Sequence, residues 1–462
     1  MEWQAAWEDP FRAFLGSFRS LVGDKRTWVT LTETIRGIIG AGSLLCQRIA
    51  AQSPVLSQAR NMAQRVLRLA KGQSTKRSRI DDVQLTTKLR ERGVAHLSEV
   101  DTDELWVILD GSGLCKPYAR DMPALMMVRD TDGKLVPGYS TLTALGITPT
   151  RRGILYQRVY SSKEAGFVSE PAEVQKALQT VSQALEGLKQ RLTVSWILDR
   201  GFDDIAVWRT IWEQGEHLVC RIDEEDRRVE FCDRHGHWQP GTIAQARQHL
   251  RLRARAQTEM ELCLGRQKRP KRQPVVVEIR AVPLRLTYDR NVRRPGPEIL
   301  TPQEVWLVEV RLLETNLDPW LLITDWPVSK QAQALHIFRM YRQRWAVEDS
   351  FKFTKKCLGW EEVQLLDLQG IRTMVALAWV AAAFLYEMGV TLEWPEVELL
   401  ARLGAWEPRK NRPPGKIVIS RGLRRLMEAQ ATMAFLDRYI AEHGALPPRI
   451  AALAGIPLTK EL

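Results

Sequence analysis

The sequence has few cysteines and no apolar run long enough to cross a bilayer. Its 462 residues include 6 cysteines, too few for the disulfide framework of a secreted scaffold. The longest apolar run covers 373–384, with Leu385 and Tyr386 behind it, and a membrane span needs roughly 20 such residues. We therefore expect a buried alanine-rich helix there and no membrane partner.

The first residues do not have the pattern of a signal peptide, and acidic charge is the scarcer sign. MEWQAAWEDPFRAF has neither the basic start nor the apolar core of a secretory signal, so we expect a cytoplasmic protein. The 67 Lys and Arg residues outnumber the 55 Asp and Glu residues, which gives a formal net charge of +12. This balance favours a polyanionic partner, either nucleic acid or an anionic membrane surface.

Two apolar, strand-like runs end in an aspartate. LWVILDGS contains Asp110, and TVSWILDRGFDD contains Asp199. Between them, MMVRD and LVPGYSTLTAL flank a turn at 130–133, ILYQRVYSS is a third extended run, and a helix fits 171–191. With a further helix over 203–213, this order is that expected of an RNase H-like domain. Both aspartates would lie at strand ends, where their side chains can converge on one rim of a sheet.

A third carboxylate lies in MYRQRWAVEDSFKFTKKCLGW, residues 340–360. Read as one helix, this stretch places Tyr341, Arg344, Glu348 and Lys355 on one face. A core-facing stripe would be apolar, so this face predicts binding of an anion with a metal nearby. A single Glu–Lys pair is usually only a solvated face, whereas the combination of four residues is more specific.

The combination Y-x2-R-x3-E-x6-K resembles the signature of one branch of the DDE insertion-sequence transposases, which has a β-strand insertion domain. ILDGSGLCK and WILDRGFDD resemble the two aspartate motifs of that family, and DPWLLITDWPVSKQAQAL resembles the end of its insertion. The resemblance spans about 105–360. It implies that Asp110, Asp199 and Glu348 are the catalytic, metal-binding triad.

The expected chemistry is metal-dependent cleavage of phosphodiesters. Two divalent ions can clamp the attacking and leaving oxygens, and Mg²⁺ prefers carboxylate and water ligands. We therefore expect two Mg²⁺ ions, which Mn²⁺ can replace, with Asp110 bridging them and Asp199 and Glu348 each completing one. Taken singly, a buried aspartate at a strand end is more often a cap or turn partner.

The resemblance also implies DNA contacts. In relatives that form a hairpin intermediate, a tryptophan near the end of the insertion stacks on a flipped base; here it aligns with Trp320, with Trp326 as the second choice and a core tryptophan as the alternative. The expected DNA-binding residues are Tyr341, Arg344, Lys355, Trp320, Arg200 and Lys116.

The 149 residues between Asp199 and Glu348 are too many for one connecting helix, so the predicted core is interrupted. We expect an α/β protein with an RNase H-like catalytic core over 96–215 and 329–400, a β-rich insertion over 216–328, a helical N-terminal DNA-binding domain over 1–95 and a helical tail over 401–462 for dimerisation or DNA contact. The N-terminal helices suit either a helix-turn-helix reader or a plain bundle.

Basic clusters in the insertion favour phosphate contact over a merely solvated face; they are Arg251, Arg253, Arg255, Arg266, Lys268, Arg269, Lys271, Arg272, Arg285, Arg290, Arg293 and Arg294. His217-x2-Cys220 and Cys232-x2-His235 have the spacing of a zinc site, with His237 to spare. Strand alternation points His217 and Cys220 to opposite sides, so an ordinary β-hairpin is the preferred interpretation.

The sequence thus predicts a DNA transposase that binds the terminal inverted repeats of its element and, with Mg²⁺, cleaves and transfers strands. Its partners would be these ends and target double-stranded DNA, it would act as a homodimer on DNA, and it would be associated with the nucleoid in the cytoplasm. Two alternatives remain open. One is an RNase H-fold nuclease without strand transfer; the other is a domesticated sequence-specific DNA-binding protein with a vestigial triad.

Overall fold

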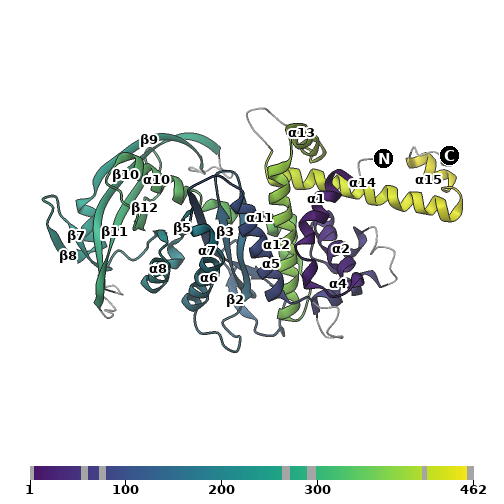
Figure 1. Cartoon of the computed structure of the whole chain (residues 1–462), viewed down its shortest axis with the longest axis horizontal. Helices are drawn as coiled ribbons and strands as arrows, with labels where there is room; N and C mark the ends of the chain where they lie inside the picture. Colours follow the sequence, from purple (N-terminus) through teal and green to yellow (C-terminus); the bar gives the residue numbers. More distant parts are fainter. Residues whose placement is uncertain are drawn as a thin grey trace.

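One continuous mixed sheet runs through the molecule, with helices on both faces (Figure 1). The computed structural model describes residues 5–53, 61–71, 80–262, 271–288, 298–407 and 414–454. Within them the sheet has twelve strands, in the order β2-β3-β1-β5-β6-β12-β11-β10-β7-β8, with β4 on β3 and β9 on β10. The first six are β1 (Glu104–Cys115), β2 (Met126–Arg129), β3 (Leu135–Ile147), β4 (Arg152–Tyr160), β5 (Thr193–Leu198) and β6 (His217–Arg221).

Strand β1 is longer than the sequence pattern indicates. It pairs in antiparallel register with β3 as far as Cys115 opposite Gly138, so Asp110 lies within the strand and not at its end. The reason is that β3 is long enough to keep pairing with the polar Gly-Ser-Gly segment after Asp110. The parallel pairing of β1 with β5 does end there, at Leu109 opposite Leu198.

Two layers of helices cover the sheet. The face that carries Val107 and Leu109 packs against α6 (Glu170–Ala184), α7 (Glu186–Lys189) and α8 (Ile205–Trp212). The face that carries Ile108 packs against α10 (Gln331–Arg342), α11 (Trp345–Cys357) and α12 (Leu368–Thr391). The single helix predicted over 171–191 is divided in the structure into two helices, α6 and α7, and Ser169 is the N-cap of α6.

The insertion extends this same sheet. β12 (Trp320–Thr324) pairs with β6, and β11 (Glu298–Leu312) and β10 (Lys271–Tyr288) follow. The predicted β-rich insertion also contains β7 (Arg228–Cys232), β8 (Trp238–Thr242), the short α9 (Ile243–Ala246) and β9 (Arg251–Leu262). The cluster of Arg251, Arg253 and Arg255 lies on strand β9. Arg266, Lys268, Arg269, Arg290, Arg293 and Arg294 lie outside the described residues.

Several of the described basic side chains of the insertion have acidic partners nearby. Arg255 and Arg280 both pair with the buried Glu278, and Arg285 pairs with Glu304. These ion pairs neutralise part of the positive charge within the insertion. The number of Lys and Arg residues in the sequence therefore overstates the positive charge available to bind phosphates.

The N-terminal helices pack against α12. They are α1 (Ala5–Gly16), α2 (Lys25–Ala41), α3 (Cys46–Ala51), α4 (Met62–Lys71) and α5 (Asp82–Ser98). Helix α2 ends at Gly42, whose φ of 57° is a left-handed value that glycine adopts readily. Residues 54–60, between α3 and α4, lie outside the described residues.

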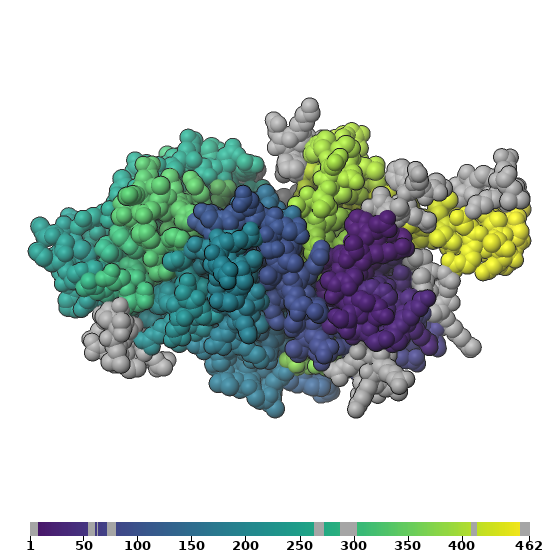
Figure 2. Space-filling view, viewed as in Figure 1, coloured from purple at the N-terminus to yellow at the C-terminus, as the bar shows by residue number. Residues whose placement is uncertain are grey.

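Helix α12 is the central core helix. It has 24 residues, more than the run of the sequence suggests, and among the described residues it is the helix long and apolar enough to cross a membrane. However, 83% of its most apolar window is buried inside the protein. After it come α13 (Trp394–Leu403), α14 (Lys416–His443) and α15 (Pro448–Ala454); the outer part of α14 and α15, in yellow, extend beyond the body of the molecule (Figure 2).

Candidate active site

The sheet register makes the two aspartates neighbours. Asp110 and Asp199 are the first positions after the last parallel pair of β1 and β5, Leu109 and Leu198. Adjacent strands lie about 4.8 Å apart, so both carboxylates reach the same place. The main-chain N–H of Gly111 donates to Asp110 Oδ1 at 2.8 Å. The sequence prediction that these two residues converge is in agreement with this register.

The predicted single helix over 340–360 is wrong. Helix α10 ends at Arg342 and α11 begins at Trp345, with Arg344 as its N-cap residue. Between them the chain tightens: the N–H of Arg344 donates to the carbonyl of Tyr341 at 3.0 Å, a spacing of three residues that interrupts the α-helical series. Tyr341, Arg344 and Glu348 still face the aspartates, but from two helices and the turn that joins them.

Arg344 lies at the centre of the three carboxylates. One terminal nitrogen, Nη1, is 3.6 Å from Asp110 Oδ2 and 3.5 Å from Asp199 Oδ2, and the other, Nη2, is 2.7 Å from Glu348 Oε1. The Arg344 side chain is only 8% exposed, and its Nε has no hydrogen-bond partner. Its guanidinium therefore occupies the position of a cation shared by the triad.

Burial and charge shift the pKa values of this cluster. Burial raises the pKa of Asp110 to about 7, although Arg344 and the Gly111 N–H oppose that shift. Burial lowers the pKa of Arg344, but Asp199 and Glu348 outweigh it and the net change is upward. One carboxyl of the cluster thus titrates near neutral pH, whereas the central cation stays charged.

Tyr341 and Trp320 extend the cluster towards the insertion. Tyr341 is 2% exposed, and its hydroxyl donates to Asp199 Oδ1 at 3.1 Å. Burial raises the pKa of Tyr341. Trp320 is half-buried on β12, with its ring 5.3 Å from that of Tyr341 and stacked on Phe338 at 6.1 Å. It lies next to the site but is also packed, so the structure combines features of both interpretations of this tryptophan.

The other expected DNA-binding residues have different surroundings. Lys355 Nζ donates to the carbonyl of Gly113 at 3.0 Å and pairs with Glu361 at 3.1 Å. Arg200 is exposed and lies 3.9 Å from Asp223. Lys116 is buried and donates to the carbonyl of Glu361 at 3.0 Å and to that of Val363, and burial lowers its pKa to about 8.

This placement of Lys116 does not fit the expected DNA contact. Its ammonium holds the chain after α11 against the end of β1. The sequence around Lys116 gives no local sign of this burial, because the partners of its ammonium are main-chain carbonyls about 245 positions away.

The donor set of the triad suits a hard cation such as Mg²⁺, since three carboxylates from three elements are directed at one positive centre. In the described part of the chain, no group of three His, Cys, Asp or Glu residues is already gathered as a metal site. The guanidinium holds the carboxylates around itself.

The histidine and cysteine cluster has other partners. His217 Nδ1 lies 2.6 Å from Asp325 Oδ2, and its ring stacks on Trp326 at 4.1 Å. Cys220 is buried with its thiol near the carbonyl of Asp199. Cys220 therefore lies on β6 beside the end of β5 that precedes Asp199. His217, at the other end of β6, joins an aromatic cluster with Trp326.

Sequence reasoning missed one residue beside the triad. Trp345 is 57% exposed, and the guanidinium of Arg344 lies 5.3 Å from its ring centroid. An exposed indole at the first position of a helix, directly after a buried arginine, is a surface on which a base can stack. The local sign was the tryptophan inside the Y-R-E-K segment itself.

Residues 171–385 match a family model described as a transposase DDE domain. This segment is similar to a DDE transposase domain. It contains Asp199, Tyr341, Arg344, Glu348 and Lys355, whereas Asp110 precedes it. The match supports a transposase of the DDE type and is independent of the geometry around Arg344.

Two further comparisons add little. A solved structure, the cryo-EM structure of a piggyBac transposase synaptic complex with hairpin DNA, is similar to this chain with 12% identity and a TM-score of 0.40, covering 98% of this chain and 82% of that one. At this score the likeness carries no argument. No curated protein matches the sequence.

Proposed function

We propose that the protein is a DDE transposase that binds the terminal inverted repeats of its insertion sequence, cleaves DNA strands there and joins them to target DNA. The observation that carries the proposal is the convergence of Asp110, Asp199 and Glu348 on one cationic centre. The match of residues 171–385 to a transposase DDE domain supports it.

In this proposal the first strands of the sheet, with α10 to α12, form an RNase H-like catalytic core over 96–215 and 329–400. The β-rich insertion is 216–328, the helices of 1–95 bind DNA, and the tail of 401–462 contacts DNA or a second subunit. Support comes from the order β3-β1-β5, in which β1 is antiparallel to β3 and parallel to β5. Support for an assembly function of the tail is the projection of α14 from the body (Figure 1).

The triad would hold two Mg²⁺ ions, or Mn²⁺ in their place, which supply Lewis-acid activation of the attacking oxygen and stabilise charge on the leaving oxygen. The chain's own part is to gather the ligands and place the DNA. Arg344, once displaced from the carboxylates, would grip a phosphate with its planar fork. Tyr341 orients Asp199 through its hydroxyl. Lys355 offers a point charge at Gly113, three residues beyond Asp110 on β1.

Trp320 is proposed as a stacking surface for a base displaced at the DNA end. Its place beside Tyr341, one contact away from Asp199, supports this. Arg200, exposed directly after Asp199, is proposed to contact the same DNA. The protein would act as a homodimer on double-stranded DNA, in the cytoplasm and at the nucleoid.

The test is cleavage of a labelled duplex that carries the element's end, with Mg²⁺ or EDTA, by wild type and Glu348→Gln. We expect nicking that needs Mg²⁺ and falls at least about 100-fold in the variant, because several kcal/mol of charge stabilisation are lost, while DNA binding persists. Glu213→Gln, which removes an exposed carboxylate at the end of α8 on the opposite face of the sheet, is the matched control.

Two outcomes would favour the alternatives. Cleavage without joining of a pre-cut end to target DNA would indicate a nuclease of this fold. Specific binding by wild type with no cleavage in Mg²⁺ or Mn²⁺ would indicate a DNA-binding protein that has lost the activity.

A further inference from the structure

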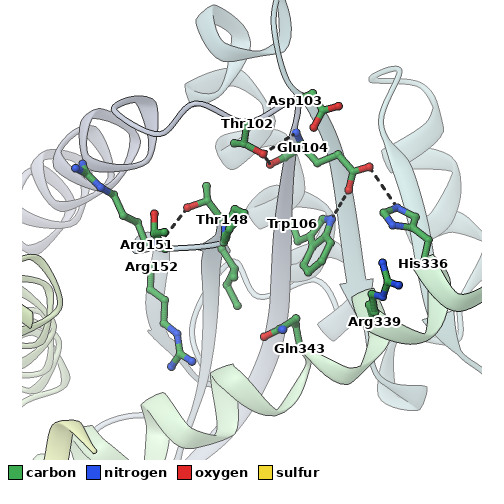
Figure 3. Close-up of a pocket in the computed structure, with 13 residues that line it drawn as sticks. Thr102, Asp103, Glu104, Trp106, Thr148, Arg151, Arg152, His336, Arg339 and Gln343 are labelled. Atoms are coloured by element: carbon green, nitrogen blue, oxygen red, sulfur yellow. Dashed lines mark hydrogen bonds and ion pairs between the residues drawn. The ribbon is translucent and has the colours of Figure 1, made fainter. Parts of the chain in front are cut away.

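A cavity of about 630 Å³ lies where β1, β3 and β4 meet α10. Figure 3 shows Trp106 in its middle, with His336 and Arg339 on one side, Thr148 and Arg152 on the other, and Gln343 below. The lining combines an aromatic ring with three arginines and with the acidic side chains of Asp103 and Glu104. None of its residues is among the DNA contacts proposed above.

Trp106 is held in a fixed orientation. Its indole N–H donates to Glu104 Oε2 at 2.9 Å, while Glu104 Oε1 lies 3.3 Å from His336 Nε2. The ring is half-buried and packs at one side against the core beneath α10, and His336 meets it edge-on at 6.2 Å. A ring fixed in this way offers its remaining surface to a ligand at little entropic cost.

The cavity also contains cationic groups with spare hydrogen-bonding capacity. Arg339 is exposed on α10 and makes no ion pair or hydrogen bond within the described part of the chain. Among the residues that the structure describes, the ion-pair partner of Arg152 is Asp349, at a long 3.5 Å, and the Arg152 side chain is 37% exposed. Arg151 is already engaged by Glu99 and the carbonyl of His96, so we assign it no contact with the ligand.

The cavity and the triad share one face of β1. Side chains alternate along a strand, so Glu104, Trp106 and Asp110 point the same way. Asp110 is four positions after Trp106, which is about 13 Å along the strand, or about four nucleotides at the rise of one DNA strand. Gln343, which lines the cavity, directly precedes Arg344 of the carboxylate cluster.

We propose that this cavity binds one unpaired nucleotide of a DNA strand that passes the carboxylates, with its base stacked on Trp106 and its flanking phosphates held by Arg339 and Arg152. Stacking on an indole tolerates any base, and the guanidinium fork matches a phosphate. The inference rests on the proposed function, because it takes DNA as the ligand. It adds a subsite about four nucleotides from the bond to be cut.

The probe is a short fluorescein-labelled duplex with a single-stranded 3′ overhang, compared with the same duplex whose overhang is abasic. For the wild-type chain we expect the natural overhang to bind about 5- to 140-fold more tightly than the abasic one. Trp106→Leu should remove this difference, and Trp106→Phe should retain most of it. Equal binding of all proteins to the abasic probe shows that the variants are folded.

The arginines are tested through salt dependence. Arg152→Gln combined with Arg339→Gln should lower the slope of log K against log salt by about 1.4 to 1.8, the loss of two phosphate contacts. Lys176→Gln, which removes an exposed charge on α6 at the opposite face of the sheet, should leave the slope unchanged.

Two results would overturn the inference. One is equal affinity of wild type for the natural and abasic overhangs; the other is unchanged discrimination in Trp106→Leu. If wild type still cleaves DNA in a Mg²⁺-dependent and Glu348-dependent way, only the subsite fails. If wild type binds neither probe, the subsite and the proposed function fail together.

Discussion

Replacing Arg344 by glutamine should destabilise the metal-free protein strongly. The guanidinium is 8% exposed and lies within 3.6 Å of an oxygen of each of three carboxylates. Removing one partner of a buried ion pair costs about 3–5 kcal/mol. Glu348, at 41% exposed, keeps part of its hydration, so we expect a loss near the lower limit, about 3 kcal/mol.

The loss should depend on pH. The pKa of Asp110 is raised to about 7 in the folded protein, so this carboxyl is largely protonated below that pH and repels its neighbours less. Arg344→Gln should therefore cost more free energy of unfolding at about pH 8 than at about pH 6. Mg²⁺ should stabilise the variant more than wild type, because the ion need not displace the guanidinium; binding at 100 times the Kd adds about 2.7 kcal/mol.

The assay is urea unfolding at both pH values, in EDTA and in saturating Mg²⁺. Arg342→Gln is the control, because Arg342 is an exposed arginine two positions earlier that contacts only Thr258 and the carbonyl of Glu259; it should change stability by less than about 1 kcal/mol. Equal stability of Arg344→Gln and wild type at both pH values, with no extra effect of Mg²⁺, would refute the role assigned to Arg344.

Three more predictions use the same unfolding assay. The pKa of Asp110 is raised from its ordinary 3.8, so ionisation of this carboxyl takes stability from wild type as pH rises from about 4 through 7. Asp110→Asn lacks this loss and should gain up to about 4 kcal/mol relative to wild type above pH 7. A difference between the two proteins that does not depend on pH would contradict this prediction. Arg227→Met should cost about 3–5 kcal/mol, because Arg227 and Asp203 form a 2.8 Å pair that is nearly inaccessible; a cost below about 1 kcal/mol would show that the pair is dispensable. A Cβ at Gly93 would lie 2.4 Å from a main-chain oxygen of β4, so Gly93→Ala should cost about 1–3 kcal/mol, whereas Gly187→Ala, which meets no atom within 4 Å, should not destabilise.

Much of the local structure could be predicted from the sequence. The apolar runs around Asp110 and Asp199, the turn at 130–133 and the break after α2 follow from side-chain alternation and from glycine, all of which act over a few residues. The Y-R-E-K signature also associated Glu348 with Arg344 correctly. A signature depends on residue types and spacing, so it can be recognised whether or not the helix is continuous.

Other features needed partners far apart in the chain. The tight turn that separates α10 from α11 accompanies the burial of Arg344 among carboxylates of β1, β5 and α11, which no helical wheel contains. The burial of Lys116 depends on carbonyls after α11. Strand β9 has an arginine-rich alternation that is typical of a solvated segment until β10 pairs with it, and β8 contains a proline and a glycine, which disfavour strands until β7 pairs with it.

The sequence by itself determined which side chains could do chemistry: three carboxylates, an arginine, a tyrosine and a lysine in recognisable segments. The tertiary structure alone decided that β1 and β5 are parallel neighbours, which brings Asp110 beside Asp199, and that Trp106 and Arg339 line one cavity. The physical reason is that strand pairing and burial join segments about 90 to 240 residues apart, and the free energy of those contacts is not written in any short stretch of the chain.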